Sequence, residues 1–497
     1  MRGAEALERR QLLAADVHVG VVYYEEDSGQ DTAPDVFHIT FEGGPDDTQL
    51  AQLIIDTDKA GDGLSVADGF FDTEDGGAGT FESHGPQILS QAGIDSVTFD
   101  VVDGGTQLLF TFEGFDPGET LVFGIDVDER GFLPGSSSAV TEGAEFEGSQ
   151  FIATLSAPHH FDLTGSAVFL DSFDHSGLPF TLPPDEYVPP STTPQAFRTA
   201  GAALSDQMTP LPITISGTVF EDFDLDNDQD PGDPGIADVT LQLWQFDGTD
   251  YVATGKTTTT DGDGNYEFTD VLPGRYRVVE VQPADLFSVG ATAGTVDGAT
   301  RGSVLSPDVI TEIDLLGGDD SIDNDFAEAR PASLAGHVFH DADDDGVFDA
   351  GETGIGGVTI QVQRLPDGAP PEAPIEVQTL ADGSWAVTGL RPGNYVVREV
   401  QPEGYLDGKD APGNLGGTAL PQPGDEISSV FLFSGQAGIN YDFGEILPSS
   451  ISGFVHADRD GNCVLDPGDQ PLEGVVIELL DGTGTPIATT ARNDEGR

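Results

Sequence analysis

Short runs of alternating apolar and polar residues recur along this chain, and clusters of Gly, Pro and Asp separate them. Residues 97–102 and 107–112 flank a Gly104-Gly105 pair, which is typical of a β-hairpin, and residues 121–127 follow as a further apolar run. Period-two alternation of β-branched residues favours half-buried strands over helices. The chain also holds 65 glycines and 33 prolines among 497 residues, a density that argues against helical bundles. The pattern therefore predicts an all-β protein.

Internal repetition is the strongest signal in the second half of the chain. Three segments open alike, with Gly217, Gly336 and Gly453 at the same place and roughly 120 residues apart. Each opening leads into an acidic loop and then into an alternating run, at residues 239–244, 358–362 and 475–479. The first two copies also share a later half with a Pro-Gly turn, whereas the third reaches Arg497 before its aromatic strand. Tandem antiparallel β-sandwiches, the third truncated, are the expected arrangement.

Residues before the repeats do not match them, so we predict a separate N-terminal β-sandwich of jelly-roll type. The segment from Pro183 to Pro212 is rich in Pro, Thr, Ser and Ala, which is typical of an extended linker. The predicted divisions are residues 1–16 as an export leader-like segment, 17–182 as the N-terminal sandwich, 183–213 as the linker, 214–329 and 330–447 as complete repeats, and 448–497 as the truncated repeat.

The acidic loops contain the most specific functional motif of the sequence. Aligned on the repeat glycines, their acids fall at positions 1, 3, 5, 9 and 12, the ligand spacing of a twelve-residue calcium loop. The candidate ligands are Asp222, Asp224, Asp226, Asp228, Asp230 and Asp233 in the first loop, Asp341, Asp343, Asp345, Asp349 and Glu352 in the second, and Asp458, Asp460, Asn462, Asp466 and Asp469 in the third.

Electrostatics gives this spacing a physical meaning. Two carboxylates about 4 Å apart repel by ~4 kcal/mol at an effective dielectric constant of 20, so they converge only around a cation. Oxygen ligands on a flexible loop favour Ca²⁺ over Zn²⁺, Cu²⁺ or Mg²⁺. The alternative is a solvated acidic turn that never converges. Position 6, a glycine in typical calcium loops, is Asn227, Gly346 and Cys463 here, and cysteine adopts the left-handed backbone poorly.

These motifs resemble a known family. The openings with their acidic loops, the Asp-Gly turn before an aromatic residue, and the segments at 276–283 and 395–402 are similar to the SdrD B-like domain, a relative of the Cna B-type repeat of bacterial surface proteins. The resemblance covers roughly residues 214–497 and implies prealbumin-like or Ig-like β-sandwiches, loops that bind Ca²⁺, and a spacer role. The flanking elements read as strands, so no helix-pair switch of the calmodulin kind is implied.

Cna B-type relatives often carry a Lys–Asn isopeptide bond with a nearby acid. Glu280 and Glu399 match that acid, and Asn324 and Asn440 match the asparagine. None of the lysines, Lys59, Lys256 and Lys409, lies in an opening strand. We therefore expect no isopeptide crosslink, which leaves metal as the stiffening agent.

The charge narrows the choice of partners. Asp and Glu total 89 against 18 Lys and Arg, a net charge of −71, so nucleic acid and anionic membranes are excluded as expected partners. No apolar run is long enough for a membrane span. Residues 7–13 resemble the leader of large exported bacterial proteins, with a frayed N-terminus as the alternative reading. A salt-adapted surface is a further explanation of the charge, and it predicts acids spread evenly over all surfaces.

Motifs of catalysis are absent, so we expect no enzyme. Asp56, Asp58 and Asp62 form either a further calcium turn or a plain Asp/Gly turn. The sequence predicts a secreted or cell-surface structural or adhesion protein with Ca²⁺ as its cofactor. Its other expected partners are extracellular matrix, a glycan or a neighbouring surface protein. The alternative is an accessory spacer or carbohydrate-binding region of a larger secreted carbohydrate-active enzyme.

Overall fold

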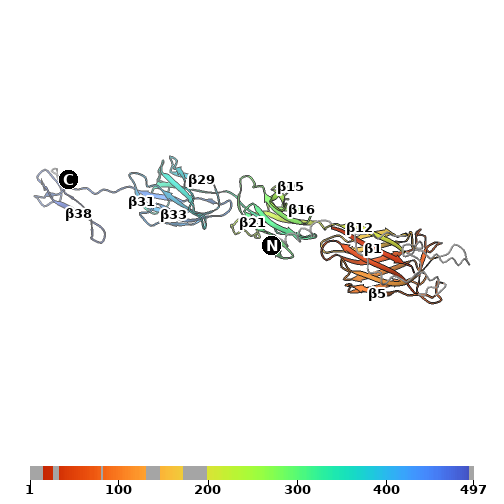
Figure 1. The fold of residues 1–497 in the computed structure, drawn as a ribbon. Coiled ribbons are helices and arrows are strands. Elements are labelled where there is room, and N and C mark those ends of the chain that lie inside the picture. The colour runs from red at the N-terminus through yellow and green to blue at the C-terminus, as the bar shows by residue number, and fades with distance from the viewer. Residues whose placement is uncertain are drawn as a thin grey trace. The chain divides into compact units, whose positions relative to one another are not determined.

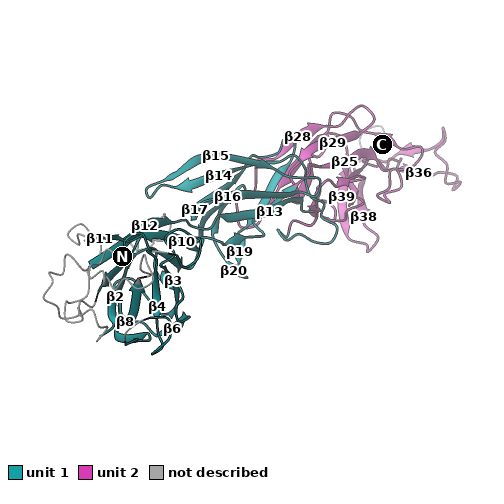
Figure 2. Cartoon of the chain, turned by 90° about the vertical axis from the view of Figure 1, so that its right-hand side faces the viewer, with its two compact units in different colours: residues 1–222, 226–328 teal, residues 223–225, 329–497 magenta. Residues whose placement is uncertain are grey.

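The computed structural model describes residues 15–25, 33–65, 67–79, 82–129, 146–171 and 199–491, and these form strands and turns with no helix (Figure 1). The all-β prediction is confirmed. Among the described residues, accordingly, there is no helix of the length and apolarity that a membrane crossing requires. The chain divides into two compact units, one of residues 1–222 and 226–328 and one of 223–225 and 329–497 (Figure 2). Residues 1–14 of the predicted leader lie outside the described part.

The N-terminal domain is a sandwich of two sheets. One sheet has the order β11-β12-β1-β2-β8-β4, with β5 also paired to β8, and the other has the order β10-β9-β3-β7-β6. The strands are β1 Ala15–Tyr24, β2 Asp35–Gly43, β3 Gln49–Asp56, β4 Gly69–Asp72, β5 Gln87–Ala92, β6 Ser96–Val101, β7 Gln107–Glu113, β8 Thr120–Glu129, β9 Gln150–Ser156, β10 Leu163–Val168, β11 Leu170–Asp171 and β12 Thr199–Met208.

Alternation explains how strands such as β9 contribute to the main core, beside which β1, β2 and β8 form a smaller apolar cluster of Val22, Tyr24, Val36 and Val122. In β9, every second side chain is buried, and the buried faces of both sheets contribute to a single apolar cluster. Aromatic rings fill its centre: Phe123 stacks on Phe37 at 4.8 Å and meets Phe110 at 4.7 Å between ring centroids. The predicted hairpin is confirmed, because β6 pairs antiparallel with β7. The sandwich is therefore as expected, while its jelly-roll connectivity stays a prediction.

The predicted linker at residues 183–213 is wrong in its second half. β12 pairs antiparallel with β1 along ten residues, from Ala15 opposite Met208 to Tyr24 opposite Thr199. Ala200, Ala202 and Met208 are buried in the core. The composition of this segment, rich in small residues, gives no indication of a strand, because the stability of the strand comes from pairing with a distant segment. Residues 183–198 lie outside the described part of the chain.

The first repeat, residues 213–329, is a sandwich with its own core. One sheet has the order β16-β13-β24-β18, with β23 also beside β13, and the other has the order β15-β14-β17-β22-β21. The strands are β13 Ile213–Glu221, β14 Thr240–Phe246, β15 Tyr251–Thr259, β16 Asn265–Val271, β17 Gly274–Glu280, β18 Phe287–Thr292, β19 Thr295–Val296, β20 Ala299–Thr300, β21 Ser303–Ser306, β22 Val309–Leu315, β23 Asp320–Ser321 and β24 Asp325–Ala329.

The second repeat has the same plan. Its sheets have the orders β26-β25-β35-β31, with β29 and β34 also beside β25, and β28-β27-β30-β33-β32, around a separate core. The strands are β25 Ala332–His340, β26 Thr353–Gly354, β27 Thr359–Arg364, β28 Ile375–Gln378, β29 Ser384–Leu390, β30 Gly393–Glu399, β31 Leu406–Ala411, β32 Thr418–Ala419, β33 Glu426–Leu432, β34 Ala437–Gly438 and β35 Asp442–Ile446.

The third copy forms two separate hairpins, and its residues described up to 491 contribute to no buried apolar cluster. β36 His456–Ala457 pairs with β37 Gln470–Pro471, and β38 Val476–Leu480 pairs with β39 Pro486–Ala491. The side chains of β38 and β39 are all exposed. Among the residues described up to 491, no second sheet covers these side chains.

Candidate metal-binding loops

The three acidic loops follow the first strand of each repeat and share one hydrogen-bond pattern. In each, the carboxylate at position 1 accepts a bond from the backbone N–H at position 6. The donor–acceptor pairs, each at 2.8 Å, are Asn227 with Asp222, Gly346 with Asp341, and Cys463 with Asp458. This bond curls the first half of the loop over its own first ligand.

Position 6 has the left-handed backbone in all three loops. The φ angles of Asn227, Gly346 and Cys463 are 66°, 84° and 63°. A calcium loop needs such a turn at position 6. Cys463 therefore adopts a backbone conformation that is unfavourable for cysteine. The third loop nevertheless makes the same turn as the other two.

Two further bonds recur in register. The N–H of position 7 donates to the side chain of position 5, and the N–H of position 9 donates to the acid of position 12. The first set pairs Asp228 with Asp226, Val347 with Asp345 and Val464 with Asn462. The second pairs Asp230 with Asp233, Asp349 with Glu352 and Asp466 with Asp469. Three copies of one network show that the acids hold equivalent places.

Only part of the predicted ligand set converges. In the first loop, carboxylate oxygens of Asp222, Asp224 and Asp226 lie within 4.8 Å of one another. In the second, Asp341, Asp343 and Glu352 meet the same description. Asp222 and Asp341 are buried at the base of their loops, whereas Asp224, Asp226 and Asp343 are exposed. The remaining predicted ligands stand on the same loops outside these groups of three: Asp228, Asp230, Asp233, Asp345 and Asp349.

The carboxylates of the second loop repel one another. The pKa of Asp343 is raised above its usual value, chiefly by the charge of Asp345 and then by partial desolvation and the other loop acids. Lys409 on β31 bonds through Nζ to the backbone carbonyl of Asp344, a contact that the sequence gave no sign of. The crowding is that expected of a loop arranged for a cation.

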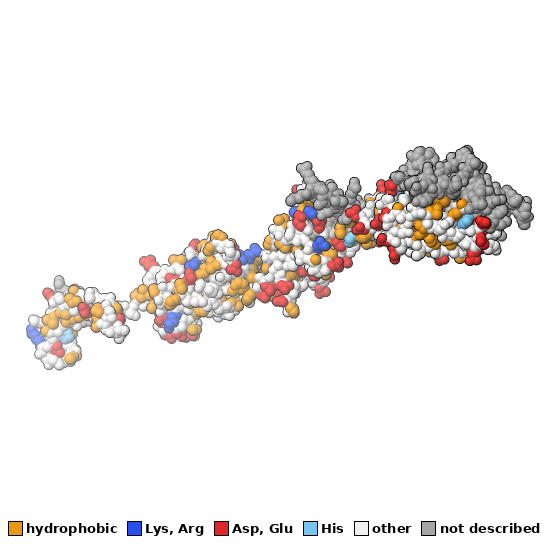
Figure 3. All heavy atoms as spheres, turned by 60° about the horizontal axis from the view of Figure 1, so that its bottom comes forward, with side chains coloured by type: hydrophobic (Ala, Val, Ile, Leu, Met, Phe, Trp, Pro, Cys, Tyr) orange, Lys and Arg blue, Asp and Glu red, His pale blue; other side chains and the backbone are white. Residues whose placement is uncertain are grey.

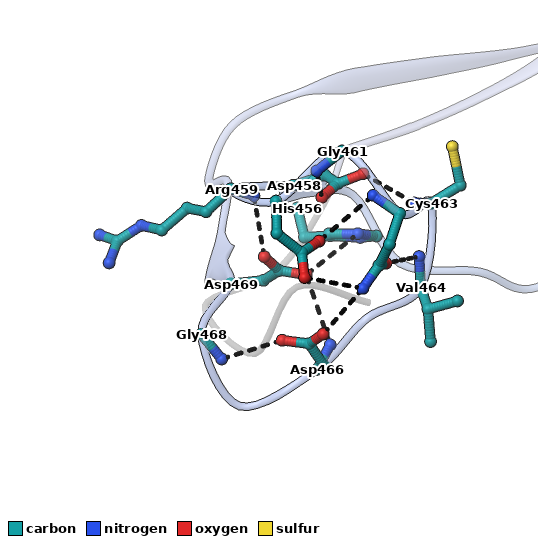
Figure 4. A network of polar contacts seen from close by, with 11 residues as sticks. His456, Asp458, Arg459, Gly461, Cys463, Val464, Asp466, Gly468 and Asp469 are labelled. Carbon is teal, nitrogen blue, oxygen red and sulfur yellow. Dashed lines mark hydrogen bonds and ion pairs between the residues drawn. The ribbon is translucent and has the colours of Figure 1, made fainter.

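In the third loop, the polar groups of the loop bond to one another (Figure 4). Asn462 donates through Nδ2 to Asp460 and Asp466, each at 3.0 Å, and His456 lies 3.6 Å from Asp469. Backbone N–H donors, that of Cys463 first, lower the pKa of Asp458. Its predicted ligands Asp458, Asp460, Asn462, Asp466 and Asp469 therefore lie close together, with several of their oxygens engaged by protein donors.

The asparagine matched to an isopeptide site in repeat 1 has other contacts. Asn324 is buried, and its Nδ2 donates to Ser216 and Ser321. Glu280 and Glu399 are also buried. Lys256 donates through Nζ to the carbonyls of residues 269 and 270 on the surface, away from these acids.

The acidic turn of the N-terminal domain involves a residue that the sequence pattern did not single out. Asp58 and Asp62 lie within 4.8 Å of the buried Asp68, whereas Asp56 is outside this group. Asp58 accepts bonds from the N–H groups of Gly61, Asp62 and Gly63, the pattern of an Asp/Gly turn. Both readings of this segment remain compatible with its geometry.

Acids are not confined to the loops. On the face drawn in Figure 3, Asp and Glu side chains recur over each part of the described chain, with Lys and Arg scattered among them. An acidic surface and acids in ligand register are therefore both present.

Similarity to known proteins lies in the second half of the chain. A family model of the SdrD B-like domain matches residues 213–326 and 332–444. The serine-aspartate repeat-containing protein D of Staphylococcus aureus is 30% identical over 281 residues, which are 56% of this chain and 20% of that protein. Protein F of Staphylococcus epidermidis is 26% identical over 287 residues, or 57% of this chain and 16% of that protein. The chain thus spans about a fifth of the length of the curated relatives it matches.

Solved structures with some likeness include pilins. The minor pilin GBS52 of Streptococcus agalactiae is 15% identical, with a TM-score of 0.22, and the match covers 49% of this chain and 99% of that one. A streptococcal ancillary pilin is 12% identical, with a TM-score of 0.24, over 71% of this chain and 80% of that one. The sequence matches agree with a non-catalytic protein that is secreted or at the cell surface, and they give no support to the carbohydrate-active enzyme alternative. Residues 213–326 and 332–444 are thus two tandem segments similar to the SdrD B-like domain.

Proposed function

We propose that this chain is a structural and adhesion region of a secreted or cell-surface protein, and that Ca²⁺ held by its acidic loops stiffens its tandem sandwiches into a stalk. The supporting observation is the hydrogen-bond network that recurs in register in all three loops. It fixes the backbone so that three carboxylates converge in each complete repeat.

The chemistry of these oxygens favours Ca²⁺. Oxygens within 4.8 Å of one another can all touch an ion at 2.3–2.6 Å, the Ca²⁺–oxygen distance. The bound ion cancels the repulsion among the acids and ties the loop to the buried base residue, Asp222 or Asp341. Because the loop connects two strands of each sandwich, fixing it restrains the end of that domain. Extracellular matrix, glycans and neighbouring surface proteins are the partners we expect for such a stalk.

Calcium is expected to raise the unfolding temperature of both complete repeats. A ligand that binds only the folded state at a hundred times its Kd adds ~2.7 kcal/mol to the free energy of unfolding. The chain has two tryptophans, Trp244 in repeat 1 and Trp385 in repeat 2, so emission of Trp385→Phe and Trp244→Phe variants reports on each repeat separately. The measurement is thermal unfolding of the full chain in excess Ca²⁺, in Mg²⁺ and in EDTA.

Single charge changes separate a loop site from a general effect of charge. Asp224→Asn is expected to reduce the calcium-dependent shift in repeat 1, and Asp343→Asn the shift in repeat 2. Asp297→Asn and Asp367→Asn each remove one exposed acid elsewhere in the same repeats and serve as matched controls. Equal unfolding temperatures in all three solutions would contradict the proposal and leave the acids as a solubility surface.

A further inference from the structure

The acidic loop of each complete repeat lies beside the last strand of one sheet, which is β18 in repeat 1 and β31 in repeat 2. The residue of this strand that faces the loop is Gly290 in repeat 1 and Lys409 in repeat 2. The two positions are equivalent, because they lie four residues before Gly294 and Gly413. An ideal Cβ at these two glycines would lie 2.3 and 2.2 Å from an isoleucine carbonyl oxygen. The strands therefore meet their loops with different side chains.

In repeat 1 the loop supplies the contact. Asn227, at position 6, donates through Nδ2 to the backbone carbonyl of Ala291 at 3.3 Å and to Oγ1 of Thr292 at 3.0 Å. Gly290 leaves room for this side chain, since an ideal Cβ there would lie only 2.2 Å from Asn227 Oδ1. The amide therefore fits because the strand has no side chain at this place.

Repeat 2 reverses the arrangement. The loop has Gly346 at position 6, and an ideal Cβ there would lie 3.2 Å from the Cβ of Lys409. Lys409 reaches the loop and donates through Nζ to the backbone carbonyl of Asp344, at position 4. Gln422 donates through Nε2 to Oδ1 of the same aspartate at 3.1 Å. The contact thus comes from the strand, and it places one positive charge against an acidic loop.

Both contacts act on backbone that needs support. Asn227 and Asp344 have φ angles of 66° and 56°, in the left-handed region that is unfavourable for residues with a Cβ, although least so for Asn and Asp. Asp and Glu also occupy six positions of each of these twelve-residue loops, and their charges repel one another. Hydrogen bonds from Asn227 and Lys409 offset part of both costs.

We propose that Asn227 and Lys409 are positioning residues of the acidic loops, and that each holds its loop in the bent conformation before a cation binds. The repeats use exchanged partners: a loop amide lies over a strand glycine in repeat 1, and a strand amine lies over a loop glycine in repeat 2. A loop that is already ordered binds an ion more readily, because less conformational freedom is lost on binding. Only this statement about the ion rests on the proposed function; the contact between loop and strand does not.

A double-substitution cycle in EDTA tests the exchange of partners. Gly290→Lys alone is expected to lower the folding equilibrium constant of repeat 1 by about tenfold or more, because the new Cβ and Asn227 Oδ1 cannot share the same space. With Asn227→Gly also present, the lysine is expected to cost less than about threefold, because repeat 1 then has the pair of repeat 2. Urea unfolding followed by Trp244 emission in a Trp385→Phe background measures both values.

Gly262→Lys is the matched control, because no atom lies within 4 Å of an ideal Cβ at this glycine of repeat 1. It is expected to leave the folding equilibrium constant within about threefold of the parent, with or without Asn227→Gly. If Gly290→Lys cost the same in both backgrounds, the loop and the strand would not be coupled and the proposal would be overturned.

Amide hydrogen exchange of the loop peptides in the full chain tests whether the contacts position the loops. Lys409→Met keeps most of the side-chain stem and removes the ammonium, so in EDTA the bonded amides of residues 341–352 are expected to exchange roughly tenfold faster. In excess Ca²⁺ the parent rate is expected to return, because the ion then fixes the loop. Lys256→Met is the control, since this lysine bonds carbonyls on the surface of repeat 1, and it should change the exchange of neither loop.

The result in EDTA decides the positioning role. Unchanged exchange of the second loop in Lys409→Met would overturn the proposal. Faster exchange throughout repeat 2, in EDTA and in Ca²⁺ alike, would also overturn it, because it would show a general loss of stability. Parent loops whose exchange Ca²⁺ does not slow would contradict the proposed function, whereas a loop-specific increase in EDTA would still support the positioning role.

Discussion

Replacing Gly336 with alanine is expected to lower the free energy of unfolding of repeat 2 by roughly 3 kcal/mol or more, because the new methyl group would overlap the backbone of another strand. A Cβ built at Gly336 would lie 1.8 Å from the carbonyl oxygen of Tyr441 and 2.5 Å from its carbonyl carbon. That backbone cannot move away freely, since Tyr441 donates its N–H to Ala335 and the following β35 pairs parallel with β25. The strand must shift, and the ladder between β25 and β35 weakens with it.

Repeat 1 repeats this close approach, and the third copy lacks it. A Cβ at Gly217 would lie 2.0 Å from the carbonyl oxygen of Asn324, whereas no atom lies within 4 Å of one at Gly453. Gly217→Ala should therefore destabilise repeat 1 comparably, and Gly453→Ala is the matched control with little effect. Urea unfolding followed by emission of Trp385 in a Trp244→Phe background measures the repeat 2 variant. A Gly336→Ala protein as stable as its parent would show that the two strands are not held this closely.

These glycines show what the sequence could and could not provide. Their recurrence aligned the three repeats and placed the acidic loops in register, and the shared hydrogen bonds of the loops follow that alignment. Their physical reason, contact with a strand more than a hundred residues later, is a property of the folded chain. A single sequence does not reveal which backbone segments approach each other.

Other features of the structure could not be predicted from the sequence for related reasons. β12 lies in a segment of small and polar residues whose strand structure depends on pairing with β1. Glu280 and Glu399 were recognised only as matches to an isopeptide acid. Glu328 and Glu445, whose carboxylate oxygens lie within 4.8 Å of those of Glu280 and Glu399, look like ordinary polar residues of a terminal strand. Local alternation does not show that the two sheets bury these acids together. The candidate ligands of the loops, by contrast, could be identified from the sequence, because the candidates of each loop lie within twelve residues.

Replacing Phe123 with alanine is expected to destabilise the N-terminal sandwich by about 3–5 kcal/mol, the range for a buried aromatic cut back to a methyl group. Phe123 on β8 is fully buried, and it stacks on Phe37 from β2 and meets Phe110 from β7, so it joins the two sheets. Removing it leaves a cavity that rigid neighbouring strands cannot close, and the lost contacts belong to both layers.

Both tryptophans of the chain lie outside this domain, so amide hydrogen exchange of peptides from β2, β7 and β8 is the suitable measurement. Where exchange requires global unfolding, the expected loss of protection is roughly 10²-fold to several thousand-fold. Val102→Ala, at a side chain that is 70% exposed, is the control and should leave protection within a few-fold of the parent. Similar protection in the two variants would mean that Phe123 does not join the sheets, and the main core of this domain would have to be divided. If instead only Phe123→Ala loses protection, and loses it equally in β2, β7 and β8, the two sheets unfold as one cooperative unit.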